Sequence, residues 1–110
     1  MPHFTFSKIA EKDNFELAKV IKTVLIEQGN NKDGTVFTDS ATDKMFDGYR
    51  AENSIYFVVY KDSKLIGGCG IAQLPGEKES VCELQRLFLL KEYRGFGIGQ
   101  KLIEMCINFA

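Results

Sequence analysis

The chain has 110 residues, of which 45% are hydrophobic and 26% are charged, and its net charge is −1. This composition is that of one ordinary globular domain, and the balanced charge argues against a basic surface for nucleic acid or for a membrane. No apolar run approaches the ~20 residues of a membrane span, and the N-terminus lacks the apolar core of a secretory signal. We therefore expect a cytoplasmic protein.

The cysteines and the single histidine offer little metal or redox chemistry. Cys69, Cys82 and Cys106 are odd in number and widely spaced, which argues against a disulfide framework and against a zinc site. Each lies in an apolar segment, so we expect reduced, buried thiols and no metal. His3 is expected at the surface, which removes most histidine-based proton transfer.

The N-terminal part predicts a strand and then two helices. Apolar and polar residues alternate over residues 3–10, as in a strand. A helix should follow, with Asp13 as N-cap, Glu16 completing a capping box and Gly29 ending it. Its apolar face is expected to contain Leu17, Ile21, Val24 and Leu25.

A flexible loop is predicted over residues 30–35, followed by a weaker helix over about residues 40–51. Gly48 lowers the helix propensity of this segment. The side of the helix that we expect to be buried contains Met45, Phe46 and Tyr49.

Three strands and a final helix follow. The strands are predicted over residues 54–61, 64–74 and 81–90, with a tight reversal at Asp62 and Ser63 and a turn over residues 75–80. The glycines of the middle strand allow a bulge or a close approach of another backbone. The final helix should direct Leu102, Ile103, Cys106 and Phe109 inward. The predicted order is β-α-α-β-β-β-α, an α/β (α+β) fold with a mixed, mostly antiparallel sheet.

The glycine-rich stretch "YRGFGIG" at residues 93–99 lies between the last strand and the last helix. A helix N-terminus presents unpaired amides and a positive dipole end, and glycines let an anion approach them. Arg94 adds a planar cation that suits phosphate oxygens. The loop lacks the Lys-Ser/Thr ending of a P-loop and the third glycine of a dinucleotide fingerprint. Two interpretations remain, a phosphate site and a glycine-rich turn that binds nothing.

The residues before the loop favour the first interpretation. The stretch "ELQRLFLLKEYRGFGIGQKLI" resembles the acetyl-CoA-binding core of the GNAT family of N-acetyltransferases, whose loop reads Gln/Arg-x-x-Gly-x-Gly/Ala. Arg94, Gly97 and Gly99 match that pattern, and Glu92 and Tyr93 match its lead-in. The "Leu-x-Pro" that often precedes the loop is "LLK" here. The order of elements upstream also resembles that of the family.

The resemblance implies one N-acetyltransferase domain over residues 1–110 that includes the acetyl-CoA-binding motif. Family members continue with further strands and a helix. Of three explanations for their absence, namely truncation, a partner protomer that covers the fourth strand's edge, or a naturally minimal fold, we favour truncation. The missing part commonly supplies a tyrosine that protonates the leaving thiolate, and we assign that role to none of Tyr49, Tyr56, Tyr60 and Tyr93.

The resemblance also implies acetyl-CoA as cosubstrate, with its pyrophosphate on the loop and its pantetheine arm paired with the backbone of Leu87 and Leu89. The implied cofactor-binding residues are Leu87, Leu89, Arg94, Gly95, Phe96, Gly97, Ile98, Gly99 and Gln100. A strand rises ~3.3 Å per residue, so Glu83 lies roughly 20 Å before Leu89, a span similar to the reach of the pantetheine arm.

Glu83 is the candidate general base, the position at which the family often places its catalytic glutamate. We expect a partly buried carboxylate that takes the proton of an amine before the nitrogen attacks the thioester. A solvated edge carboxylate, or one paired with Arg86, is the alternative. Gln85 projects to the same face and either positions substrate or is an ordinary strand residue.

The expected function is direct transfer of acetyl to a primary amine of a small molecule or peptide, with no covalent intermediate. By fold analogy, residues 28–39 together with Tyr49 and Arg50 would line the acceptor entrance. An acyl-CoA-binding or regulatory module without turnover, and an interaction domain whose loop binds nothing, are the competing hypotheses. Expected partners are the amine and a second copy at the fourth strand's edge, with no nucleic acid and no membrane.

Overall fold

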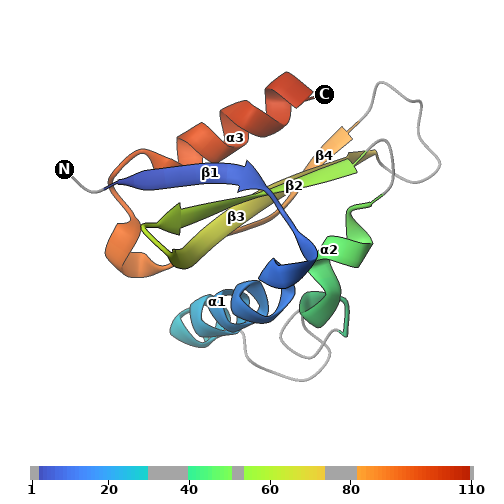
Figure 1. Ribbon diagram of the computed structural model, residues 1–110. Helices are drawn as coiled ribbons and strands as arrows, with labels where there is room; N and C mark the ends of the chain where they lie inside the picture. Colours follow the sequence, from blue (N-terminus) through green and yellow to red (C-terminus); the bar gives the residue numbers. More distant parts are fainter. Residues whose placement is uncertain (1–2, 30–39, 51–53, 74–81, 110) are drawn as a thin grey trace.

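The computed structural model describes residues 3–29, 40–50, 54–73 and 82–109. Within them lies a four-stranded sheet in the order β1-β2-β3-β4, antiparallel throughout (Figure 1). The strands are β1 (Phe4–Lys8), β2 (Ser54–Lys61), β3 (Lys64–Gln73) and β4 (Cys82–Leu89). All four agree with the predicted strands, and Asp62, with φ 57°, forms the reversal after β2. The predicted loop at residues 30–35 and the turn at residues 75–80 lie outside the described residues.

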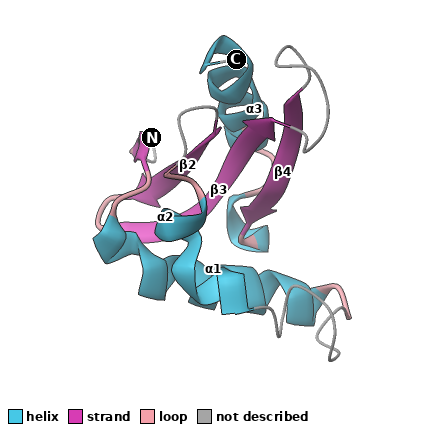
Figure 2. Cartoon of the chain, turned by 90° about the vertical axis from the view of Figure 1, so that its right-hand side faces the viewer, coloured by secondary structure: helices cyan, strands magenta, loops and turns pink. Residues whose placement is uncertain are grey.

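Helices cover both faces of the sheet. Figures 1 and 2 show α1 (Asn14–Glu27) and α2 (Met45–Gly48) against one face, and α3 (Ile98–Phe109) against the other. The two central strands are therefore buried on both sides. The side chains of α1 and α3 that are fully buried between these layers are those of Leu17, Ile21, Leu102 and Cys106. No helix in the described part of the chain is long and apolar enough to cross a membrane.

The start of α1 differs from the predicted capping box. Asp13 is already helical, at φ −82° and ψ −14°, and its side chain makes no hydrogen bond to the helix that follows. Its carboxylate instead points back, where Oδ2 accepts the amide of Ala10 at 2.7 Å and Oδ1 meets the Tyr60 hydroxyl. The predicted pairing with Glu16 is wrong because a short 3-10 turn, η1 (Glu11–Asp13), precedes the helix. Gly29, at φ 75°, follows the helix end as predicted.

The second helix is shorter than predicted. Residues 40–44 form a 3-10 turn, η3 (Ser40–Lys44), and only Met45–Gly48 is α-helical. The amide of Phe46 donates to Oδ1 of Asn14 at 2.7 Å, which ties α2 to the start of α1. Met45 is buried, whereas Phe46 and Tyr49 are half-buried.

Two burial predictions are wrong. Cys69 and Cys106 are buried free thiols as expected, but Cys82 is exposed because it begins β4 at the edge of the sheet. Phe109 is 42% exposed because it lies in the last turn of α3. His3 is exposed, as predicted.

Strand β4 contains a β-bulge opposite the glycines of β3. Gly68 pairs with Phe88 and Gly70 pairs with Gln85, so β4 carries one residue more than β3 over this interval. Arg86 lies in the bulge with φ 51°, a left-handed conformation that is unfavourable for a residue with a β-carbon. The hydroxyl of Tyr56 donates to the Arg86 carbonyl at 2.7 Å and holds it in place.

The ring of Tyr56 occupies space that only glycines provide. A β-carbon on Gly68 would fall 2.4 Å from Cε1 of Tyr56, and one on Gly70 would fall 2.7 Å from Cδ2 of the same ring. The ring is fully buried, and burial holds the pKa of Tyr56 well above its ordinary value. The glycines of β3 thus admit the side chain that fixes the bulge of β4.

We expect Gly68→Ala to lower the free energy of unfolding by about 2–3 kcal/mol, because the new methyl overlaps the Tyr56 ring and also lies 2.6 Å from the Phe57 carbonyl. Urea denaturation measures the change. Gly48→Ala is the matched control, since a β-carbon there meets no described atom within 4 Å and should be neutral or stabilising by up to ~1 kcal/mol. Equal stability of the two variants would contradict this assignment.

Candidate functional site

The glycine loop begins after β4 with a short 3-10 turn, η4 (Lys91–Tyr93), and leads into α3. Gly95 and Gly97 adopt φ 91° and 77°, conformations that other residues rarely accept. A β-carbon on Gly95, Gly97 or Gly99 would meet no atom of the described residues within 4 Å. The loop therefore leaves open space along these glycines.

The side chains between the glycines anchor the loop to the protein. Ile98 is only 3% exposed and belongs to the core. Phe96 packs against Phe4 of β1 with ring centroids 5.8 Å apart, and Tyr93 meets the same ring edge-on at 6.3 Å. Ile98, predicted to bind cofactor, can therefore contribute only its backbone.

The first turn of α3 presents amide groups before its own hydrogen bonds begin. The amide of Lys101 donates to the Gly97 carbonyl at 3.1 Å, so the amides of Ile98, Gly99 and Gln100 precede that first intrahelical bond. The dipole of this twelve-residue helix adds positive potential at the same place. Loop and helix together form a surface suited to an anion.

Arg94 lies beside this surface. Its Nε and Nη2 donate to the Leu89 carbonyl at 3.1 and 3.0 Å, and Nη2 lies 3.8 Å from Oε1 of Glu27. The Leu90 amide donates to the Ile66 carbonyl, so Leu90 and Ile66 form a hydrogen-bonded pair of the antiparallel ladder. Because such pairs alternate along a strand, the preceding residue, Leu89, directs its N–H and C=O away from β3. The last residue of β4 thus presents its backbone at the free edge of the described sheet.

Glu83 and Gln85 lie on the other side of the bulge. Both project to one face of β4, as predicted, and Nε2 of Gln85 donates to Oε1 of Glu83 at 3.1 Å. Glu83 is exposed, so the partial burial expected for it is not found among the described residues. Arg86 instead directs Nη1 toward Oγ1 of Thr42 and Sδ of Met45, each at 3.4 Å.

Tyr49, expected at the acceptor entrance by fold analogy, joins this group, although no sequence pattern predicts its contact with Gln85. Its hydroxyl donates to Oε1 of Gln85 at 2.7 Å, and burial raises the pKa of Tyr49 to about 12. The segment from α2 thereby reaches the middle of β4. The sequence feature related to this contact is Gly70, because the absence of a β-carbon there leaves room for the Tyr49 ring.

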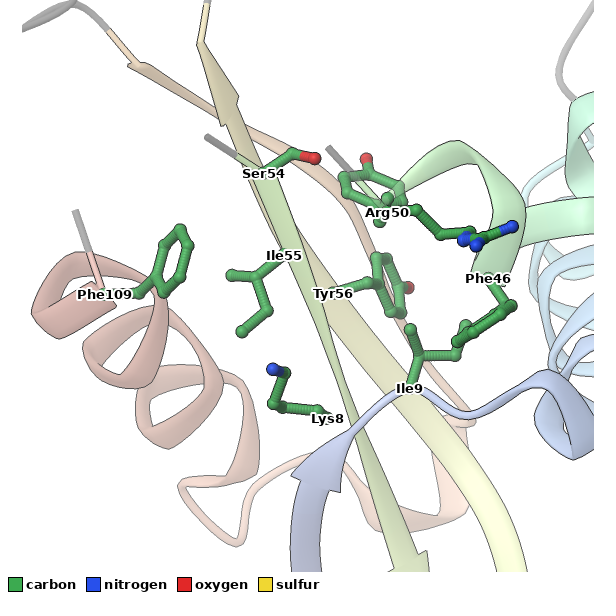
Figure 3. Close-up of a pocket in the computed structure, with 9 residues that line it drawn as sticks. Lys8, Ile9, Phe46, Arg50, Ser54, Ile55, Tyr56 and Phe109 are labelled. Atoms are coloured by element: carbon green, nitrogen blue, oxygen red, sulfur yellow. The ribbon is translucent and has the colours of Figure 1, made fainter. Parts of the chain in front are cut away.

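A pocket of about 340 Å³ lies away from the glycine loop, around the start of β2 (Figure 3). Figure 3 shows Ile55 and Phe109 on one side of the strand and Tyr56 and Phe46 on the other. The pocket thus wraps around the edge of β2. Its lining includes Phe109 at the C-terminal end of α3, whereas the loop lies at the N-terminal end (Figure 1). Of the predicted site residues that the structure describes, its lining includes only Tyr49 and Arg50 of the acceptor entrance.

Comparison with known proteins identifies the family. Residues 21–110 match the model of the acetyltransferase (GNAT) family. The chain is 34% identical over 104 residues to the uncharacterized N-acetyltransferase YjgM of Escherichia coli K12, and the match covers 94% of this chain and 62% of that protein. The chain belongs to the GNAT family.

Solved structures show the same fold. A GNAT-family acetyltransferase from Staphylococcus aureus Mu50 superposes with a TM-score of 0.80 at 17% identity, covering 97% of this chain and 65% of that one. An acetyltransferase from Clostridium acetobutylicum superposes with a TM-score of 0.72 at 18% identity, covering 96% and 72%. The predicted α/β fold and the resemblance to the family are confirmed. The chain spans less than two thirds of the length of YjgM and of the Staphylococcus protein.

We expect Gly97→Ala to destabilise the fold by about 1–2 kcal/mol and Gly99→Ala to change stability by less than ~0.5 kcal/mol. Both positions have open space, but only Gly97 has a positive φ. Urea denaturation of the two variants measures the difference. Similar values for both would show that the loop does not require the left-handed conformation.

Proposed function

We propose that this chain binds acetyl-CoA along the free edge of β4 and on the glycine loop, and transfers the acetyl group to a primary amine. The observation that carries the proposal is the juxtaposition of edge strand and loop. The last residue of the edge strand, Leu89, directs its backbone outward, and the short turn η4 then leads to open glycines and to the amides of α3 that precede its intrahelical bonds. This arrangement offers backbone partners to an extended amide arm and donors to the phosphates that follow it.

In this proposal the amides of residues 95–100 hold the pyrophosphate, and Arg94 adds its guanidinium. The backbone of Leu87 and Leu89 pairs with the pantetheine arm, so that the thioester reaches the half of β4 that contains Glu83. The acetyltransferase structures from Clostridium acetobutylicum and Brucella melitensis were determined with acetyl-CoA, which supports the choice of ligand.

Glu83 acts as the general base. An amine is mostly protonated at neutral pH, and it becomes nucleophilic only after a carboxylate, directly or through water, removes a proton. The nitrogen then forms a bond to the thioester carbonyl carbon, the carbon–sulfur bond breaks, and the thiolate leaves and takes up a proton to give free coenzyme A. No covalent enzyme intermediate is needed.

The acceptor is a small-molecule or peptide amine. The cytoplasmic location, the single domain over residues 1–110 and a second copy at the β4 edge stay predictions.

The second candidate function is acyl-CoA binding without turnover by this chain. It is favoured by the exposure of Glu83, which leaves the base without a surrounding site among the described residues.

We expect Gly99→Ala to weaken acetyl-CoA binding about tenfold or more, because its methyl group would project into the open space over the helix amides. Arg94→Ala should weaken binding to a similar degree. Isothermal titration calorimetry measures both, with Gly48→Ala as a control that adds a methyl in equally open space elsewhere. If the native chain gave neither heat nor a thermal shift with acetyl-CoA, the proposed function would be wrong.

We expect Glu83→Gln to lower kcat by roughly 100-fold or more while the Kd for acetyl-CoA stays unchanged, because the amide keeps the size of the side chain and loses its basicity. A thiol-release assay over a panel of amines measures the rate. Equal rates for the two proteins would remove Glu83 as the base. Acetyl-CoA binding without thiol release from the native chain would favour the second candidate function.

A further inference from the structure

A chain of hydrogen bonds links the interior of the protein to the exposed carboxylate of Glu83. The Tyr49 hydroxyl donates to Oε1 of Gln85 at 2.7 Å, and Nε2 of Gln85 donates to Oε1 of Glu83 at 3.1 Å. Three side chains from two distant segments of the sequence thus form one connected line. The middle residue, Gln85, bonds to both neighbours through the two ends of its amide.

Each donor and acceptor in this line is determined by its neighbour. An ionised carboxylate can only accept, so Gln85 must present its NH₂ group to Glu83. The carbonyl oxygen of the same amide then faces Tyr49, which must donate its proton. The phenol can do so over the whole ordinary pH range, because burial raises the pKa of Tyr49 to about 12. The line therefore has one direction, from phenol to carboxylate.

The inner end of the line is rigid. The Tyr49 ring lies so close to β3 that a β-carbon on Gly70 would fall 2.8 Å from its Cε1 atom. It also packs against the Tyr56 ring, with centroids 5.2 Å apart and planes at 54°. Tyr56 in turn is bonded to the bulge carbonyl of Arg86, next to Gln85. The outer end, Glu83, is exposed.

We propose that Tyr49 and Gln85 are positioning residues, which hold the Glu83 carboxylate in one orientation on the face of β4 and leave its Oε2 atom to receive the proton of the amine. This inference rests on the proposed function of Glu83 as base. An exposed glutamate samples many rotamers, and holding it in one of them raises the fraction of molecules that are ready to react. Tyr49 and Gln85 thus act on the reaction only through Glu83.

A double-mutant cycle tests the proposal. Tyr49→Phe removes only the hydroxyl, and Gln85→Met keeps the length of the side chain without its amide. We expect each to lower kcat about 3–10-fold, with the KM for acetyl-CoA changed less than twofold. In the Glu83→Gln background neither should change the residual rate more than twofold. Tyr60→Phe is the matched control, since it removes a hydroxyl that bonds to Asp13 instead, and its kcat should equal that of the native chain.

Equal losses in both backgrounds, or no loss in the native background, would overturn the proposal. If Glu83 is not the base, the result is different: Glu83→Gln alone would then leave the rate unchanged.

A second measurement needs no turnover. Hydrogen exchange of the Gln85 side-chain amide, followed by NMR, should be at least fivefold slower than that of the exposed Gln28, and Tyr49→Phe should abolish the difference. Exchange as fast as that of Gln28 in the native chain would also overturn the proposal.

Discussion

The contact between the Tyr56 ring and the bare backbone of β3 determines the shape of the candidate site. Tyr56 is fully buried, crosses Gly68 and Gly70, and ends in a hydrogen bond to the carbonyl of Arg86. Arg86 has φ 51°, a backbone conformation that costs free energy for a residue with a β-carbon. The hydrogen bond from Tyr56 stabilises this conformation. The bulge in β4 therefore depends on a tyrosine from β2 and on glycines from β3.

The bulge separates two parts of β4 that have different surroundings. Beyond it, Leu89 directs its backbone to the open edge and leads into the glycine loop, which Phe96 and Ile98 anchor to the protein. Before it, Glu83 and Gln85 share one face and reach Tyr49. The loop amides that we propose for an anion follow the end of β4, and Glu83 lies near its start, so the strand itself sets the span between them. This spacing suits the long, linear cosubstrate that we propose.

Most of the fold could be predicted from the sequence because its signals are local. The strands follow from alternation and from β-branched residues, and the end of α1 follows from Gly29. The error at Asp13 arose where a buried carboxylate found a tertiary partner, Tyr60, that no local pattern contains. The exposure of Cys82 and Phe109 likewise depends on where the sheet edge and the helix end lie, which composition does not determine.

The loop of the candidate site could be recognised from its glycines and Arg94, since the spacing of the motif reflects backbone requirements. The surroundings of Glu83 could not. Tyr49 reaches Gln85 across a long separation in sequence, and it can do so only because α2 is short and Gly70 has no side chain. Contacts of this kind depend on how elements pack, so the sequence alone predicts Glu83 as a candidate but not its link to Tyr49 through Gln85.

The two hydrogen bonds from Arg94 to the Leu89 carbonyl have a consequence for any molecule that pairs with this edge of the sheet. That carbonyl already has an internal donor, so an incoming N–H group replaces a bond and does not add one. The net gain is the difference between two similar interactions, and it is small at this atom. The displaced Arg94 guanidinium, however, keeps its positive charge and its long side chain. It is then available to bind an anion beside the loop.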